Sequence, residues 1–106
     1  METEKLKDFF ERNEFTVYPT EQDGIQCAEI EKWTDGGVDM IIWLNPFTIE
    51  EFQRYVEDFR IDEEIDVHRQ GEGYKMNFTI SQSLKDFSDF HSHLKDVSLM
   101  LDKHKK

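Results

Sequence analysis

Apolar residues recur every three or four positions in three parts of the chain, which is the spacing of an amphipathic helix. The pattern predicts helices over about residues 4–13, over about residues 49–59, and from Ser81 or Ser83 to the basic C-terminal tail. The middle helix has the clearest start signal, because Thr48 is followed by a glutamate at the third helical position, as in a capping box. We expect the last helix to bury the following stripe: Leu84, Phe87, Phe90, His91, Leu94, Val97 and Leu101.

Alternating apolar and polar positions between these helices predict short strands that are joined by tight turns. We expect a strand over residues 15–19, a second over 25–33 and a third over 38–44. The third strand is apolar on both faces, which is typical of a strand in the middle of a sheet. Two further strands are expected, one around residues 65–67 and one over 74–80.

The predicted order of elements is helix, three strands, helix, two strands and helix. Short turns between consecutive strands favour antiparallel pairing. We therefore expect a small α+β domain spanning residues 1–106, with a mostly antiparallel sheet of about five strands packed with three helices. A chain of 106 residues, 37% of them hydrophobic, has enough apolar material for one core.

The acidic residues are unevenly distributed along the chain. Residues 21–66 hold 14 of the 24 acidic residues and three of the 13 basic ones, so the whole net charge of −11 falls in this stretch. The remaining residues are balanced. A field of one sign attracts cationic partners and repels nucleic acid, so we expect no direct binding to DNA or RNA.

Several chemistries are disfavoured by the spacing of residues. Asp62, Glu64 and Asp66 have the first part of an EF-hand spacing, but Val67 and Gly73 stand where that loop requires glycine and glutamate. The glycines fit no nucleotide-binding motif, and no serine lies in a nucleophile elbow. We therefore expect no cofactor and no metal ion, and the absence of a catalytic motif favours a binding role over an enzyme.

The chain also lacks the signals of a membrane or secreted protein. It has no run of about 20 apolar residues and no basic-then-apolar leader. The lone Cys27 has no partner for an intramolecular disulfide. These features predict a cytoplasmic protein that does not associate with membranes.

The histidines suggest one site to weigh against ordinary structural roles. We expect His91 to be a core histidine that hydrogen-bonds to the backbone or to a carboxylate, and Asp89 and His93 to form an exposed pair on the last helix. His68 and Arg69, with Tyr74 across the predicted hairpin, form the cluster on which a small ligand sensor or enzyme would rest.

Our main hypothesis is a small acidic binding or inhibitory module that docks on a basic protein surface. Its extreme form is mimicry of nucleic acid, with the surface of a nucleic-acid-binding protein as the partner. We expect these residues to bind the partner: Glu50, Glu57, Asp58, Asp62, Glu63, Glu64, Asp66 and Trp43.

The two tryptophans leave two interpretations open. Trp33 and Trp43 flank a hairpin turn and are expected in the core, because a small domain needs their apolar area. If their side of the sheet is uncovered, they form an aromatic patch with Ile41, surrounded by acidic residues, as in a protein-binding surface. A third hypothesis is a homodimer through the Trp43 face or through Leu99 and Met100 of the last helix.

Overall fold

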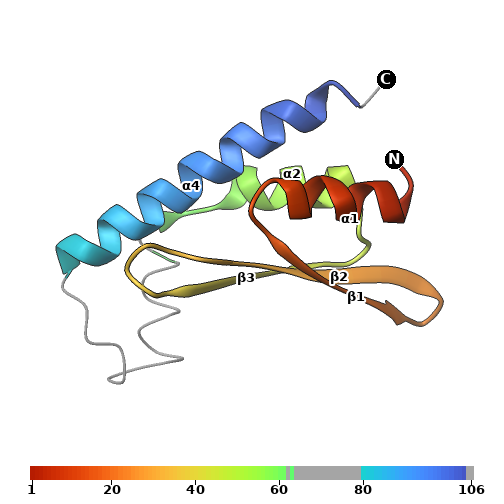
Figure 1. Ribbon diagram of the computed structural model, residues 1–106, viewed down its shortest axis with the longest axis horizontal. Coiled ribbons are helices and arrows are strands. Elements are labelled where there is room, and N and C mark those ends of the chain that lie inside the picture. Colours follow the sequence, from red (N-terminus) through yellow and green to blue (C-terminus); the bar gives the residue numbers. More distant parts are fainter. Residues whose placement is uncertain (62, 64–79, 105–106) are drawn as a thin grey trace.

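Three helices lie on one side of an antiparallel sheet in the described part of the chain (Figure 1). A computed structural model of the protein describes residues 1–61, 63 and 80–104, with the backbone alone for 80–83. The elements are α1 (Thr3–Arg12), β1 (Thr16–Gln22), β2 (Ile25–Trp33), β3 (Asp39–Leu44), α2 (Ile49–Asp58) and α4 (Ile80–Asp102). The predicted α+β class is confirmed, with three strands among the described residues where about five were expected.

The sheet is a meander in the order β1-β2-β3, and both pairs of neighbours are antiparallel. The first hairpin turns at Asp23 and Gly24, which have φ values of 54° and 80°. Two consecutive residues with positive φ match the twist of the strands they join. Gly37, with φ of 88°, gives the second turn the left-handed conformation that glycine adopts without steric cost.

Among the described strands, β3 lies at the edge of the sheet, beside β2. The central position predicted for it stays a prediction, because the further strands on which it depends fall largely outside the described residues. On its outward side, Ile41 and Trp43 are exposed, so no second layer of described residues covers these apolar side chains. The strand predicted around 65–67 lies outside the described residues, as do residues 74–79 of the strand predicted over 74–80, whereas Ile80 begins α4.

The core lies between the helices and the inner face of the sheet. Phe10 of α1 is fully buried at its centre, where its ring contacts the rings of Phe9, Phe15, Phe47 and Phe52 at centroid distances of 4.9 to 5.9 Å. Phe9 lies in α1 and Phe52 in α2, whereas Phe15 directly precedes β1 and Phe47 lies in the loop between β3 and α2. The aromatic contacts therefore join the N-terminal helix to α2 across the sheet.

Helix α2 begins as its sequence predicts. The Thr48 hydroxyl accepts a hydrogen bond from the backbone N–H of Glu51 at 3.2 Å, which satisfies one of the free donors at the helix start. The Glu51 side chain pairs with Arg54 at 3.0 Å, at a spacing of three residues along the helix.

Helix α4 packs across α2, and a buried amide fixes their contact. Gln53 donates from Nε2 to the Ser98 carbonyl at 3.0 Å and to the Asp102 carboxylate at 2.8 Å. Phe87, Phe90, Leu94, Val97 and Leu101 are buried as expected. Leu84 is the exception in the predicted stripe, since it is 47% exposed near the N-terminal end of the helix.

Candidate functional site

The side of the sheet away from the helices carries most of the large exposed apolar side chains. Alternation along the strands brings 12 residues to this side, which we call the outer face. They are Thr16, Tyr18, Thr20, Gln22, Ile25, Cys27, Glu29, Glu31, Trp33, Asp39, Ile41 and Trp43. Five of the nine large hydrophobic residues that are exposed in the described chain lie here, namely Tyr18, Ile25, Trp33, Ile41 and Trp43, each 46–57% exposed. Exposed apolar side chains gathered on one face are typical of interaction surfaces.

The exposure of the two tryptophans decides between the two interpretations of the sequence. Trp33 is 57% exposed and Trp43 is 46% exposed, so the expectation that they belong to the core is wrong and the interpretation as an uncovered patch is confirmed. The core is filled instead by phenylalanines and by aliphatic side chains of the helices and of the inner face of the sheet. Trp33 pairs with Asp39, four residues before Trp43, which separates the tryptophans by about 13 Å along the strand.

The outer face is acidic. Its charged residues are Glu29, Glu31 and Asp39, and the one basic residue of the three described strands, Lys32, points to the inner side. The Tyr18 hydroxyl donates a hydrogen bond to Glu31 at 3.1 Å. That hydrogen bond and the negative charge of Glu31, with smaller contributions from Asp39 and Glu29, raise the pKa of Tyr18. The field on this face therefore opposes a further negative charge and favours a positive one.

The partner-binding residues expected from the sequence fall on different sides of the molecule. Glu50, Glu57 and Asp58 are exposed on α2, which packs on the inner face, whereas Trp43 lies on the outer face. Glu63 is exposed just beyond α2. Asp62, Glu64 and Asp66 lie outside the described residues. The described carboxylates of the central stretch are thus divided among α2, the outer face and the two hairpin turns, and the expected set of partner-binding residues stays a prediction.

The histidine cluster stays a prediction as well. His68, Arg69 and Tyr74, on which the ligand-sensor hypothesis rests, all lie outside the described residues. The described histidines are His91, His93 and His104.

His93 has a structural role that the sequence did not show. One ring nitrogen lies 2.8 Å from the Asn13 carbonyl oxygen, and the ring packs on Phe15 at a centroid distance of 5.4 Å. Asp89 pairs instead with Lys85 at 2.8 Å. The expected exposed pair between Asp89 and His93 is therefore wrong, because His93 faces the connection between α1 and β1.

His91 is half-buried and stacks on Phe59 at a centroid distance of 4.7 Å. It has a hydrogen bond to the backbone of Val56, as expected for a histidine in the apolar stripe. Burial, followed by the positive charges of Lys95 and Arg60, lowers its pKa below the ordinary value despite that hydrogen bond.

We expect the folding stability to fall as His91 takes up a proton. Its lowered pKa means that the unfolded chain binds this proton more readily, so the contribution of His91 is complete above about pH 6.5 and decreases as the pH falls toward the native pKa. An NMR titration should give His91 a pKa below that of a histidine in the urea-unfolded chain. Lys95→Gln should raise it, whereas Lys5→Gln on α1 should not. A native pKa at or above the unfolded value would contradict the assignment.

Hollows on the helical side of the molecule offer other candidate sites. One of them, of about 200 Å³, lies where α4 meets the hairpin of β2 and β3, and is lined by Glu14, Lys32, Trp33, Thr34, Asp35, Asp86, Asp89, Phe90 and His93. Several of its polar groups already have partners within the hollow. Lys32 approaches Glu14 at 3.8 Å, and the Thr34 hydroxyl donates to Asp86 at 3.1 Å.

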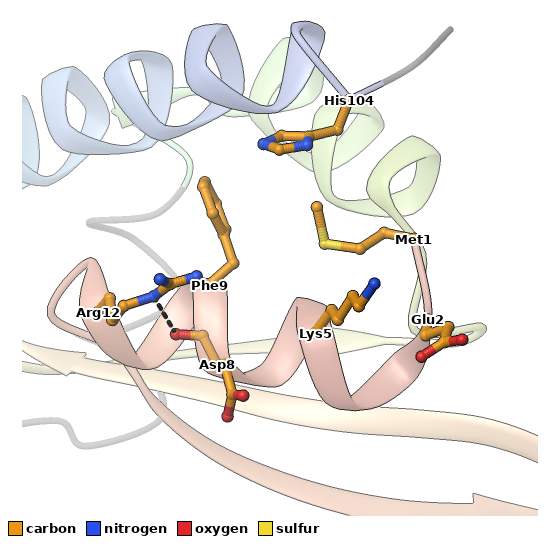
Figure 2. A pocket seen from close by; sticks show the side chains of 7 residues that line it. All are labelled: Met1, Glu2, Lys5, Asp8, Phe9, Arg12 and His104. Carbon is orange, nitrogen blue, oxygen red and sulfur yellow. Dashed lines mark hydrogen bonds between the residues drawn. The ribbon is translucent and has the colours of Figure 1, made fainter.

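A larger hollow is an open groove of about 730 Å³ between α1 and the end of α4. Figure 2 shows Phe9 pointing from α1 toward the end of α4, where His104 lies at a ring-centroid distance of 6.1 Å. Lys5 and Arg12 line the groove together with Glu2 and Asp8. Because both signs of charge are present in equal number, the groove selects no ligand class as clearly as the outer face does.

The described residues contain no group of three or more histidine, cysteine or carboxylate side chains placed to hold a metal ion. Among the described helices, none combines the length and the apolar character required to cross a membrane.

No family model matches the chain, and neither a curated protein nor a solved structure matches it.

Proposed function

We propose that this protein is an acidic binding module that docks on a basic protein surface through the outer face of its sheet. The observation that carries the proposal is the composition of that face, where exposed aromatic and aliphatic side chains lie beside carboxylates. Aromatic anchors provide most of the binding energy in protein interfaces, and the charges around them select the partner and speed association.

Charge complementarity favours a different protein over a second copy as the occupant. In a two-fold dimer, the same surface meets itself. The carboxylates of Glu29, Glu31 and Asp39 would then face their equivalents in a partly dehydrated interface, with no described basic residue on the face to neutralise them. A partner that offers apolar contacts flanked by lysine or arginine satisfies both features of the surface.

The experiment compares capture by matched variants. The tagged protein is incubated at low salt with a lysate of the organism that encodes it, and bound proteins are identified and then purified for direct affinity measurements. We expect a basic protein that elutes as salt is raised. Trp43→Ala should weaken its binding by about 30-fold or more, as expected of an interface anchor that contributes about 2 kcal/mol.

The control variant combines Glu50→Gln, Glu57→Gln and Asp58→Asn, which removes charge from α2 without changing the outer face. It should weaken binding by much less than Trp43→Ala does. Loss of binding in the α2 variant with retention in Trp43→Ala would overturn the assignment of the outer face. If the tagged protein captures only further copies of this chain, and light scattering over a dilution series shows a dimer, the homodimer would be favoured. Leu99 and Met100 of α4 are also exposed and could take part in such a dimer.

A further inference from the structure

One carboxylate of the outer face lies between two aromatic residues. The register places Tyr18 of β1 opposite Glu29 of β2, and Glu29 opposite Trp43 of β3. Side chains that stand directly opposite on one face of neighbouring strands are close enough to contact each other. The three residues therefore form a single row across the sheet, with an acid at its centre and a ring on each side.

The row has space and free bonding capacity for a ligand. The rings belong to strands that are about 10 Å apart across the sheet, and a flat group in contact with both rings needs about 7–8 Å. Tyr18 is 50% exposed and Trp43 is 46% exposed. Among the described residues, none forms an ion pair or a hydrogen bond with the Glu29 carboxylate, and the hydrogen bond from Tyr18 to Glu31 holds the tyrosine ring at one side.

These features select a guanidinium group. It is planar and positively charged, it stacks on aromatic rings, and it donates two parallel hydrogen bonds to a carboxylate. An ammonium group supplies the charge but lacks the flat surface and the paired donors. Trp33 is less suited to bind a guanidinium group. The residue opposite it on β3, Asp39, is partly buried and already interacts with other groups of the protein.

We propose that the row of Tyr18, Glu29 and Trp43 binds an arginine side chain of the partner protein. The inference rests on the proposed docking function and specifies its chemistry. It predicts that the partner presents an arginine at the centre of its binding surface, and that replacing that arginine with lysine weakens the complex although the charge is kept.

The test uses the full chain and a defined probe, N-acetyl-arginine methylamide, followed by NMR. We expect the ring signals of Tyr18 and Trp43 to shift and to saturate as the probe is added, with little change at Trp33. The corresponding citrulline compound, which has a similar shape without the charge, should cause no saturable shift. Glu29→Gln should reduce the affinity of the arginine probe about tenfold or more, because it removes a charge-assisted bidentate contact. Glu57→Gln on α2 is the matched control and should have no effect.

Equal responses to the arginine and citrulline probes, or an unchanged affinity in Glu29→Gln, would overturn the assignment. The two experiments together distinguish failure of the arginine site from failure of the docking function. If Trp43→Ala abolishes capture of the partner but the probe does not bind, docking stands and the arginine site is wrong. If the probe binds as described and no basic partner is captured, the arginine site stands and the docking function is wrong.

Discussion

Phe10→Ala is expected to destabilise the protein by about 3–5 kcal/mol, the range observed when a buried phenylalanine is truncated to alanine. The ring is fully buried and contacts four other phenylalanine rings. Its removal loses the burial of the ring and leaves a cavity between α1 and α2, which their fixed backbones cannot close. Small domains have a total stability of about 5–15 kcal/mol, so this loss removes a large part of the free energy of unfolding. Urea unfolding followed by far-UV circular dichroism measures the loss.

The same measurement on two further variants keeps this prediction open to refutation. Phe10→Leu retains most of the apolar volume and should cost about 1–2 kcal/mol, so it reports on the site even if the alanine variant does not fold. Leu99→Ala removes an apolar side chain of similar size that is 65% exposed, and it should leave stability nearly unchanged. A loss below 1 kcal/mol in Phe10→Ala would show that this ring is not the centre of the core.

The elements that the sequence predicted well depend on local information. The strand predicted over 25–33 has those bounds in the structure, since turn residues mark both of its ends. The helix after Thr48 begins where the capping pattern places it. In both cases, residues that are only a few positions away in the sequence determine the backbone conformation.

The features that the sequence predicted poorly depend on which surfaces are covered. Alternation shows that Trp33 and Trp43 share a side of the sheet, but it does not show whether helices cover that side. All three described helices pack on the other side, so an apolar outer face was mistaken for part of the core. Leu84 shows the same limit on a helix, because spacing assigns it to the buried stripe although it lies exposed near the helix end.

Polar residues that join distant elements were also missed. Gln53 and Asp86 occur in ordinary helical patterns, and nothing in their spacing indicates a partner 45 or 52 residues away. Their role depends on how α4 crosses α2 and the hairpin. For the candidate site, Trp43 was already among the residues expected to bind a partner, whereas Glu29 and Tyr18 gained significance from the register of the strands alone.

Asp86 leads to the second large prediction, because it connects α4 to the hairpin that carries the outer face. The side chain is 2% exposed and accepts a hydrogen bond from the Thr34 hydroxyl at 3.1 Å. The same hydroxyl accepts from the backbone N–H of Val38 at 2.9 Å, so a single threonine closes the turn and joins it to the helix. Asp86→Ala removes an ionised acceptor and leaves the Thr34 hydroxyl without this partner. We expect a loss of about 2–3 kcal/mol, as for a buried hydrogen bond to a charged group.

Hydrogen exchange distinguishes this connection from a general loss of stability. In Asp86→Ala, the Val38 amide should exchange faster by a larger factor than amides in the middle of β2, because the turn opens before the sheet does. Asp89→Ala, one turn further along α4, removes an exposed carboxylate that pairs with Lys85 and should change neither stability nor exchange at Val38. Uniform acceleration at all amides would assign Asp86 to general packing. Selective acceleration would show that α4 holds the hairpin, and with it the position of Trp33 on the outer face.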